Sequence, residues 1–597
     1  MSEFQEPGLV PYPASGSLCD DVQRIARESG GRTALRRRRG GSWVDVTGAE
    51  FRDQVVAVAK GLLASGVGPG DRVGLMSSTR YEWTLADYAI WYAGAVTVPI
   101  YETSSAEQVE WILADSGAVG VFLEGDKHVA VLAEVHANLP AVAEPWVFDQ
   151  GAIDALMSAG RQVPDSQVAA RREALTPDSI ATLIYTSGTT GRPKGCELTH
   201  GNFMFEIRNI VNSMPEIFLT GHSSTLLFLP LAHVFGRLIQ IGCINSGTVL
   251  GHSADLKNLV DDLAIFKPTF LLSVPRVFEK VFNASQQKAE AAGKGQIFAT
   301  AAGVAIDYSR ALDAGGPSLY LRAKHTVFDR LVYRKLRAAL GGQVEWAVSG
   351  GAPLGERLGH FFRGIGITIL EGYGLTETSG ATTLNRPDKV KIGTVGKPIP
   401  GAGVKIAEDG EIMLSGHQVF PGYWLNAKAT AEAIEPDGWF HSGDIGELDS
   451  DGYLRITGRK KELIVTAGGK NVAPAVLEDR MRSHWLVSQC MVVGDQQPYI
   501  AALITLDPES LDAWAGQRGK PIPFSMAQAA ADPDMLAEIS TVVDGANKAV
   551  SHAEAIKKFQ VLPVDWTEEG GQLTPSLKLK RNVVMVEFAD DVAELYS

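Results

Sequence analysis

DRVGLMSSTRYEWTLADYAIWYAGAVTVPIY, residues 71–101, contains a complete strand–helix–strand unit. Val73–Met76 is an apolar run of strand length, Tyr81–Tyr92 has the length of a helix, and Ala95–Ile100 is a second apolar run. Two strands joined by a helix lie parallel in one sheet. The unit therefore predicts a parallel sheet with helices packed on it, which is an α/β fold.

The same alternation continues outward to about residue 395. Further candidate strands, several followed by Gly or Ser where a helix could begin, are Val119–Leu123, Ile180–Tyr185, Leu226–Leu229, Phe270–Ser273, Glu345–Val348 and Thr368–Leu370. Beyond Gly396, Asp-Gly turn dipeptides separate short alternating segments such as GEIMLSG and GYLRITG, a pattern typical of antiparallel strands. From Lys461 onward, short strand-like and helix-like segments indicate a compact α+β unit.

We therefore expect two domains, divided at Arg459–Lys461 without a flexible linker. Residues 1–460 are predicted to form a large domain of two α/β layers and a small antiparallel β subdomain. Residues 461–597 are predicted to form a small α+β domain.

Composition limits the classes of function. The chain has 597 residues, 45% apolar and 21% charged, which is typical of globular rather than disordered or fibrous proteins. Its net charge of −14 argues against nucleic acid as a partner, and a local site must hold any anionic ligand. The four cysteines form no CxxC pair, which indicates a reducing compartment and buried thiols. No signal peptide is visible, so a cytoplasmic location is expected.

The first chemical signal is YTSGTTGRPKG, residues 185–195, which follows the strand-like SIATLIY. Small hydroxyl residues and glycines let backbone N–H groups approach a polyphosphate, and Lys194 adds a positive charge. A Walker P-loop requires Gly-Lys followed by Ser or Thr, whereas Lys194 lies between Pro193 and Gly195. The stretch predicts a phosphate loop of another kind; the plainer alternative is a surface loop without a ligand.

Seven motifs recur along the chain in one order: YTSGTTGRPKG, FLPLAHVFGR, SGGAPL, EGYGLTET, GWFHSGD, ITGRKKELIVTAGGKNVAP and LTPSLKLKR. Together they resemble the AMP-forming acyl-CoA synthetase superfamily, which also holds luciferases and the adenylation domains of peptide synthetases. YETSSAEQV, FKPTFLLSVPRVFEKV and LTPSLKLKR are most similar to bacterial long-chain fatty-acid–CoA ligases. The resemblance implies that a carboxylate reacts with ATP to give acyl-AMP and that the acyl group then passes to coenzyme A.

The resemblance implies a nucleotide site made by three motifs. The β- and γ-phosphates would be cradled by Thr186, Ser187, Gly188, Thr189, Thr190, Gly191 and Lys194. EGYGLTET would contribute Glu371, Gly372, Tyr373 and Gly374, with Tyr373 against adenine, and SGGAPL would add the opposite wall of Gly351, Ala352 and Pro353. Thr376 would donate to the α-phosphate, while Glu377 and Thr186 would hold Mg²⁺, which prefers oxygen ligands. The alternative for Glu377 is a structural one, a negative charge at a helix N-terminus, where it interacts favourably with the helix dipole.

Two carboxyl-terminal motifs complete this expected site. Asp444 is expected to accept from the ribose hydroxyls and to be joined by Arg459, although such a pair is more often a surface salt bridge. Lys578 is expected to be the catalytic lysine that neutralises the α-phosphate and the acyl carboxylate. Lys580 and Arg581 lie close enough in sequence to leave this choice open.

The second half-reaction needs access for a thiol. The resemblance implies that the small domain rotates about a hinge at Lys461. Rotation would remove Lys578 and bring Gly468, Gly469 and Lys470 to the channel for the pantetheine arm of CoA. No insertion interrupts this motif beyond the hinge, which favours CoA as the acceptor over the acceptor of an acyl-AMP ligase.

The sequence evidence for the acyl pocket and for the role of two basic segments is less specific. His233 and Phe235 are expected at the acyl entrance, with a core role for His233 as the alternative. Arg237 stands near the position where some long-chain members carry a gating tryptophan. RRRR at 36–39 is expected in a hairpin at a solvated edge. LRAKHTVFDRLVYRKLRAAL, residues 321–340, predicts a helix that packs on the core or contacts anionic lipid or the CoA 3′-phosphate.

These inferences predict a long-chain fatty-acid–CoA ligase that uses ATP, Mg²⁺ and CoA, with peripheral membrane contact as an open possibility. The alternative is a fatty acyl-AMP ligase that delivers the acyl group elsewhere. A nonenzymatic nucleotide- or lipid-binding protein would have no need of Glu377, Asp444 and Lys578 together.

Overall fold

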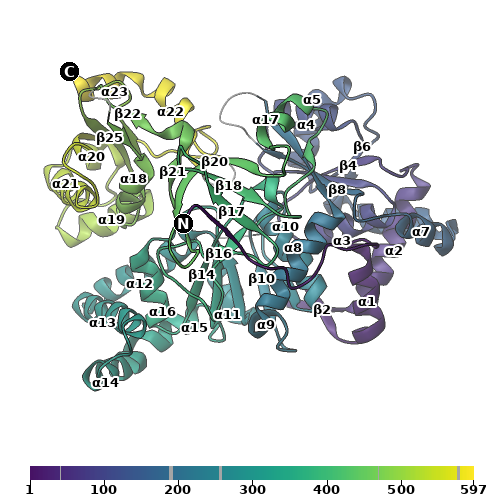
Figure 1. Cartoon of the computed structure of the whole chain (residues 1–597), viewed down its shortest axis with the longest axis horizontal. Coiled ribbons are helices and arrows are strands. Elements are labelled where there is room, and N and C mark those ends of the chain that lie inside the picture. Colours follow the sequence, from purple (N-terminus) through teal and green to yellow (C-terminus); the bar gives the residue numbers. More distant parts are fainter. Residues whose placement is uncertain (41, 187–191, 255–257, 468–469, 575–577) are drawn as a thin grey trace.

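The structure is a computed structural model that describes residues 1–40, 42–186, 192–254, 258–467, 470–574 and 578–597 (Figure 1). Its largest sheet has the order β19-β9-β8-β5-β4-β6-β7. These strands are β4 (Arg72–Met76), β5 (Val96–Ile100), β6 (Ala118–Leu123), β7 (Trp146–Val147), β8 (Ile180–Thr186), β9 (Lys194–Thr199) and β19 (Gly422–Tyr423). Strands β4 and β5 pair in parallel and helix α3 joins them at Tyr81–Tyr92, so the predicted strand–helix–strand unit is confirmed.

Two further sheets complete the α/β part. One has the order β12-β13-β14-β15-β16, with strands Phe270–Ser273, Trp346–Ser349, Thr368–Tyr373, Thr383–Leu384 and Lys397–Pro398. The other has the order β10-β11-β2-β3, with strands Ser224–Leu227, Val249–His252, Thr33–Arg39 and Ser42–Thr47. Pairing is parallel from β12 to β14 and from β10 to β2, so the predicted alternation is confirmed here too.

Helices surround these sheets and share their core (Figure 1). The first group comprises α1 (Cys19–Ser29), α2 (Gly48–Ala64), α4 (Ala106–Ser116), α5 (Asp126–Val135), α6 (Ala152–Ala159), α7 (Asp165–Glu173), α8 (His200–Ser213), α9 (Pro215–Phe218) and α10 (Val234–Ser246). The second comprises α11 (Leu259–Phe266), α12 (Pro275–Ala291), α13 (Gly295–Asp313), α14 (Leu319–Phe328), α15 (Arg334–Ala339) and α16 (Glu356–Gly364). The four cysteines are free and buried, as the sequence predicts.

The region beyond Gly396 is antiparallel, as predicted. Its sheet has the order β1-β17-β18-β20-β21, with strands Glu3–Gln5, Gly403–Ile406, Glu411–Ser415, Phe440–Leu448 and Leu454–Arg459. Helix α17 (Ala427–Ala433) follows β19. This sheet leads directly into the C-terminal residues.

The C-terminal residues fold around a sheet of the order β24-β25-β26, formed by Val487–Val493, Ile500–Leu506 and Ile556–Val561. A hairpin, β22 (Ile464–Val465) and β23 (Asn471–Val472), precedes helices α18 (Pro474–Arg482), α19 (Pro508–Gln517), α20 (Met526–Ala531), α21 (Pro533–Asn547), α22 (Arg581–Glu587) and α23 (Ala589–Tyr596). Alternate side chains of β24 and β25 enter two separate apolar clusters, which lie on opposite faces of the sheet. The α+β unit therefore has a core of its own.

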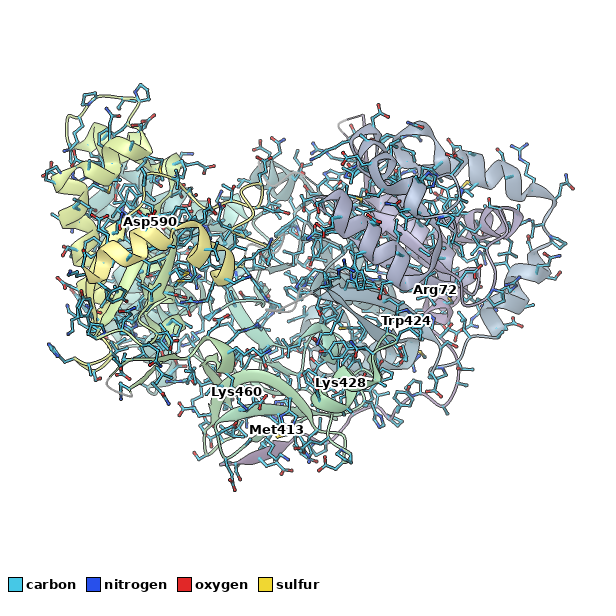
Figure 2. The ribbon with its side chains drawn as sticks, turned by 90° about the horizontal axis from the view of Figure 1, so that it is seen from above. Arg72, Met413, Trp424, Lys428, Lys460 and Asp590 are labelled. Atoms are coloured by element: carbon cyan, nitrogen blue, oxygen red, sulfur yellow. The ribbon has the colours of Figure 1, made fainter. Side chains whose placement is uncertain are left out.

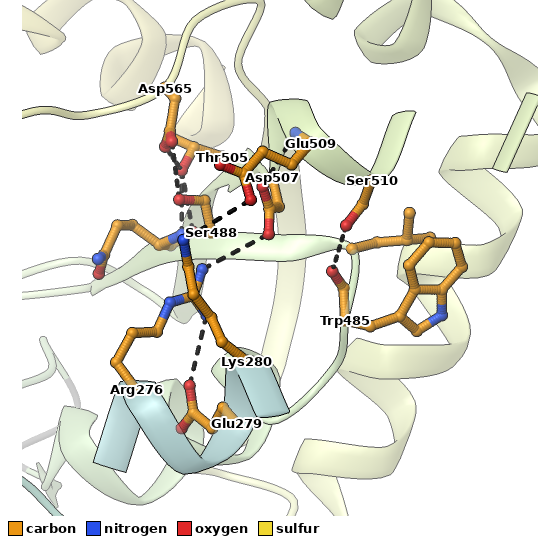
Figure 3. Close-up of polar contacts among 12 residues, drawn as sticks. Arg276, Glu279, Lys280, Trp485, Ser488, Thr505, Asp507, Glu509, Ser510 and Asp565 are labelled. Carbon is orange, nitrogen blue, oxygen red and sulfur yellow. Dashed lines mark hydrogen bonds and ion pairs between the residues drawn. The ribbon is translucent and has the colours of Figure 1, made fainter. Parts of the chain in front are cut away.

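Polar contacts join this unit to helix α12 of the large domain (Figure 3). Nη2 of Arg276 lies 3.7 Å from Oδ2 of Asp507, and Nζ of Lys280 lies 3.6 Å from Oε2 of Glu509. The amide of Gln287 donates to Oγ of Ser510 at 3.3 Å. We call these three contacts the α12 latch.

Two expectations are confirmed only in part. RRRR forms a hairpin strand, β2, in which Arg36 lies between β11 and β3, whereas Arg37, Arg38 and Arg39 pair with β3 alone and the last two are exposed. Residues 319–339 are helical without a break, but a π-helical turn, Asp329–Tyr333, lies between α14 and α15. Leu331, expected on the packed face, is 55% exposed. Among the described residues, no helix is both long and apolar enough to cross a bilayer.

Candidate active site

A cavity of about 2400 Å³ opens between the large domain and the C-terminal unit, and the sequence motifs converge on it. The phosphate loop follows the carboxyl end of β8, SGGAPL follows β13, and EGYG closes β14. Ligands in open α/β sheets bind outside these carboxyl ends, because the following loops meet there. The fold therefore brings together motifs that lie far apart in the sequence.

The phosphate loop is anchored at both ends. Thr186 ends β8 and Lys194 begins β9, and the two residues face each other in antiparallel register. Nζ of Lys194 lies 4.4 Å from the centre of the Tyr423 ring. Ser187, Gly188, Thr189, Thr190 and Gly191 lie outside the described residues.

The EGYGLTET loop carries Thr376 and Glu377 on a 3₁₀ turn, Thr376–Thr378, beside the phosphate loop. The phenol of Tyr423 donates to Oε1 of Glu377 at 2.9 Å. The carbonyl of Glu377 accepts from the backbone N–H of Phe420 at 2.9 Å. Both ends of Glu377 are thus tied to residues 420–424, the side chain to Tyr423 and the backbone to Phe420. These residues include the PGYW segment, residues 421–424, which our sequence analysis did not identify.

Tyr373, Asp444 and Arg459 form a connected set at the cavity wall. The phenol of Tyr373 donates to Oδ2 of Asp444 at 2.7 Å, and Nε of Arg459 lies 3.1 Å from Oδ1. Asp444 and Arg459 are paired residues of β20 and β21. The Asp444 carboxylate is buried beside a half-exposed guanidinium, a geometry suited to accepting two neighbouring hydroxyl groups.

Glu371 has a supporting role in the structure. Its Oε2 accepts the backbone N–H of Leu354 at 3.1 Å, which fixes the SGGAPL turn against β14. Burial raises the pKa of Glu371 to about 7. Gly351, Ala352 and Pro353 are exposed to the cavity on this turn, and Gly372 and Gly374 line the cavity opposite them.

Lys578 enters the same cavity from the C-terminal unit. The surrounding protein and the positive charge of Arg459 lower the pKa of Lys578, while Asp444 and Glu377 oppose this effect. These groups lie near enough for their charges to act on the ammonium. Arg581 instead pairs with Glu478 inside the C-terminal unit, whereas Lys578 and Lys580 both line the cavity.

The segment predicted to be a hinge contains two lysines with different surroundings, Lys460 and Lys461. Lys460 bonds Asp409 and Glu411 of the antiparallel sheet, at 2.6 and 2.9 Å, and lies on that sheet near Met413 (Figure 2). Hydrogen bonds to these carboxylates raise the pKa of Lys460 to about 12. Lys461 is exposed and lines the cavity. Lys470 lies 3.4 Å from Glu554 on the small unit, away from the cavity lining, and Gly468 and Gly469 lie outside the described residues.

His233 and Phe235 stand at the start of helix α10, where the polar part of the cavity meets its apolar part. Nδ1 of His233 accepts the backbone N–H of Phe235 at 3.1 Å and so caps the helix. Burial, together with the Lys578 ammonium, lowers the pKa of His233 to about 4. The imidazole is therefore neutral at pH 7 and serves as the N-cap of α10.

The apolar part of the cavity passes between α8 and α10. Its lining includes Ile207, Ile210, Val211, Met214, Leu238 and Ile239. The α8 residues recur at the three- and four-residue spacing of one helix face. Sequence reasoning missed this face because most of α8 is buried, so no polar side marks which apolar residues face a ligand.

Arg237 does not gate this passage. Its guanidinium is fully buried and donates to both carboxylate oxygens of Asp87, at 2.7 and 2.9 Å, and to Oγ1 of Thr182 at 3.0 Å. Helix α10 is thereby fixed to α3 and β8.

The residues present fit a magnesium ion held jointly with a nucleotide. Among the described residues, no group of three or more His, Cys, Asp or Glu side chains could hold a metal alone. Glu377 and Thr186 offer oxygen donors at the phosphate loop. Mg²⁺ is usually bound by one or two carboxylates together with substrate phosphates, so this donor set is sufficient.

This fold and this cavity define an AMP-binding enzyme. The model of the AMP-binding enzyme family matches residues 22–424, and that of the AMP-binding enzyme C-terminal domain matches residues 461–597. The chain therefore belongs to this family.

Its relatives include the long-chain-fatty-acid–CoA ligase FadD15 of Mycobacterium bovis, 56% identical over 93% of each chain. FadD15 of Mycobacterium tuberculosis is 55% identical over the same shares. The crystal structure of the anthranilate CoA ligase AuaEII with anthranoyl-AMP has a TM-score of 0.74 at 20% identity, over 97% of this chain and 99% of that one. This structural similarity shows the adenylate-forming fold.

Proposed function

We propose that this protein is a long-chain fatty-acid–CoA ligase that forms acyl-AMP from a fatty acid and ATP and then acyl-CoA. The observation that carries the proposal is a continuous cavity whose polar part is lined by Thr186, Glu377, Asp444 and Lys578 and whose apolar part passes between α8 and α10. Such a cavity accommodates a nucleotide and an aliphatic chain with the carboxylate between them. The 55–56% identity to the FadD15 ligases supports the same reaction.

In the first half-reaction, a carboxylate oxygen of the fatty acid attacks the α-phosphorus of ATP and the bond to pyrophosphate breaks. Two anions must meet, so positive charge and hydrogen-bond donors must converge on them. Lys578 supplies the charge at the α-phosphate, and Thr376 donates there. Lys194 and the phosphate loop hold the leaving pyrophosphate, while Asp444 and Arg459 orient the ribose.

Magnesium held by Glu377 and Thr186 would neutralise phosphate charge during this step. The chain's own contribution is to orient these oxygens. Neutral His233 adds no charge to the acyl entrance, where it caps α10 and thereby positions Phe235.

In the second half-reaction, the CoA sulfur attacks the acyl carbonyl carbon and AMP leaves with the electron pair of the broken C–O bond. A thiol needs access to the acyl-AMP. We propose that the small domain, residues 461–597, pivots at Lys461, since Lys460 remains bonded to the large domain. The pivot would withdraw Lys578 and bring the hairpin with Gly468, Gly469 and Lys470 to the CoA channel.

The proposal includes peripheral contact with an anionic lipid surface through the outer face of α14. Tyr320 and Val327 lie on α14 and are 70% and 55% exposed, and Leu331, on the π-helical turn that follows, is 55% exposed. Exposed basic residues flank them: Arg322, Lys324, Arg330, Arg334 and Lys335. Exposed apolar side chains surrounded by basic residues are suited to binding an anionic bilayer. The positive charge here is local, since the chain as a whole has a net charge of −14.

The experiment that tests the function is AMP release from ATP with acetate, octanoate, palmitate, oleate or benzoate, each with and without CoA. We expect turnover with palmitate or oleate only when CoA is present. Acyl-AMP that accumulates equally with and without CoA would instead identify an acyl-AMP ligase with another acceptor.

A further inference from the structure

Tyr423 contacts two different groups of the proposed nucleotide site. Its phenol donates to Oε1 of Glu377 at 2.9 Å, and its ring lies under Nζ of Lys194, 4.4 Å from the ring centre. Glu377 and Lys194 have opposite charges and come from different motifs. Tyr423 is therefore a shared neighbour of the carboxylate proposed for Mg²⁺ and the lysine proposed for phosphate.

The backbone fixes Tyr423 in this position. Strand β19, Gly422–Tyr423, pairs antiparallel with β9, so that Tyr423 stands opposite Cys196. Its N–H donates to Oγ1 of Thr430 at 2.9 Å, and the next N–H, of Trp424, donates to the carbonyl of Gly195 at 2.8 Å. The strand pairing and the Trp424 bond attach the PGYW segment to β9, the strand that leaves the phosphate loop, and the Thr430 bond attaches it to helix α17.

The Trp424 side chain adds a second attachment. Its indole N–H donates to the carbonyl of Asp115 at 3.1 Å, and the Arg72 guanidinium lies 5.7 Å from its ring centre (Figure 2). Tyr423 thus belongs to a rigid edge of the large sheet. Because the backbone of Tyr423 is fixed in this way, its side chain can orient the neighbouring side chains of Glu377 and Lys194.

The two contacts have different chemistry. A phenol that donates to one carboxylate oxygen fixes the plane of the carboxylate and leaves the second oxygen to be directed elsewhere. An aromatic face attracts an ammonium through its quadrupole without a hydrogen bond, so Lys194 keeps all three N–H donors for phosphate oxygens. Phenylalanine would preserve the second contact and lose only the first.

We propose that Tyr423 is a positioning residue that orients Glu377 toward the magnesium–nucleotide complex and holds Lys194 beside the phosphate loop. The proposal rests on the role proposed above for Glu377. It assigns to the PGYW segment a function in nucleotide binding rather than a purely structural one.

The test measures thermal stabilisation of the protein by ATP across a Mg²⁺ titration, so that it does not depend on turnover. For Tyr423→Phe we expect the Mg²⁺ concentration for half-maximal stabilisation to rise about three- to tenfold, the loss expected for one hydrogen bond. ATP stabilisation without Mg²⁺ should stay unchanged. Tyr423→Leu should weaken that Mg²⁺-independent stabilisation as well, because Lys194 loses the ring.

Tyr333→Phe is the matched control, because the Tyr333 phenol is also buried and donates one hydrogen bond, to the carbonyl of Ala301 at 2.7 Å, outside the cavity lining. It should leave the Mg²⁺ titration unchanged. An equal shift in Tyr423→Phe and Tyr333→Phe would overturn the proposal, as would no shift in Tyr423→Phe.

Glu377→Gln distinguishes failure of the inference about Tyr423 from failure of the proposed magnesium site. If this variant raises the Mg²⁺ requirement and Tyr423→Phe does not, the inference about Tyr423 is wrong and the proposed magnesium site stands. If Glu377→Gln has no effect on the Mg²⁺ titration, the magnesium site itself is wrong and the inference fails with it.

Discussion

At the scale of single residues, Gly242 controls the space available to an acyl chain. It is buried on α10 and lines the cavity, yet a Cβ added there would meet no atom within 4 Å. A leucine at this position would therefore project into the apolar passage. Each methylene that it displaces from the cavity costs about 0.8 kcal/mol of binding.

We expect Gly242→Leu to lower kcat/KM for palmitate about tenfold relative to octanoate, measured by AMP release. Leucine is a better helix former than glycine, so the fold should tolerate the change. Gly303→Leu on α13 is the control, because a Cβ there also meets open space but outside the cavity. A palmitate-to-octanoate ratio unchanged in Gly242→Leu would show that the chain does not pass between α8 and α10.

Glu371 predicts a pH dependence of stability. Its pKa is raised by burial from 4.5 to about 7, so the folded state binds the proton more tightly than the unfolded state. The stability that this carboxyl contributes is complete below pH 4.5 and is lost as the pH rises through 7. Each unit of raised pKa corresponds to about 1.4 kcal/mol.

Glu371→Gln cannot ionise and keeps an oxygen that accepts from Leu354. The melting temperature of this variant minus that of wild type should therefore become larger as the pH rises from 5 to 8. The control is Glu134→Gln at an exposed position on α5. Its melting temperature should differ from that of wild type by the same amount at every pH in this range. A flat difference for Glu371→Gln would mean that Glu371 is already ionised in the folded protein at pH 5.

At the scale of elements, the α12 latch holds the arrangement in which Lys578 reaches the cavity (Figure 3). Lys280→Glu would place two carboxylates opposite each other at Glu509. Exposed ion pairs are worth at most about 1 kcal/mol, so we expect adenylation to slow about two- to fivefold. Use of preformed acyl-AMP and CoA should not slow, because that step requires the latch to open.

The charge swap Lys280→Glu with Glu509→Lys should restore adenylation. Lys288→Glu, farther along the same helix, should behave as wild type, since Lys288 makes no ion pair with a described residue of the C-terminal unit. Equal slowing of both half-reactions in Lys280→Glu would contradict a latch role.

Most elements could be predicted from the sequence where one periodicity dominates. Tyr81–Tyr92 and Phe270–Ser273 have the predicted bounds because each is a short apolar segment between clear turn signals. The helix predicted at 321–340 was wrong in detail, since a π-helical turn rotates Leu331 outward and periodicity cannot reveal such a turn. The inner position of β2 depends on its pairing with β11, more than 200 residues away.

In the candidate site, too, some residues could be predicted from a sequence motif and others could not. Glu377, Asp444 and Lys578 carry a motif signal, and the structure brings them to one cavity. Tyr423 carries none, because a lone tyrosine before a tryptophan acquires meaning only when β19 pairs with β9. The lining face of α8 was likewise invisible, since α8 is buried on nearly every side and even polar residues such as Asn202, Glu206 and Asn209 are buried.

At the scale of the whole molecule, the outer face of α14 predicts binding to membranes. α14 lies at the outer edge of the molecule beside α13 (Figure 1). Val327→Glu should reduce sedimentation with vesicles of phosphatidylglycerol and phosphatidylcholine at least threefold, because it places an anion among the apolar side chains. Val260→Glu is the matched control, since Val260 is 50% exposed on α11 beside Asp261 and Asp262.

Wild-type binding should weaken when phosphatidylglycerol is omitted and when salt is raised. Equal binding of Val327→Glu and wild type to the anionic vesicles would show that α14 is not the lipid surface. Loss of self-association rather than of vesicle binding would identify a second copy of the chain as its partner.

In the proposed mechanism, one cavity performs both half-reactions, and the C-terminal unit supplies Lys578 only to the first. The most direct measurement compares Lys578→Ala with wild type in two assays, palmitoyl-AMP formation from palmitate and ATP, and palmitoyl-CoA formation from preformed palmitoyl-AMP and CoA. We predict that the variant loses adenylation at least a hundredfold, as removal of a group that stabilises transition-state charge does, and retains thioester formation. Equal loss in both assays, or full adenylation by the variant, would contradict the account.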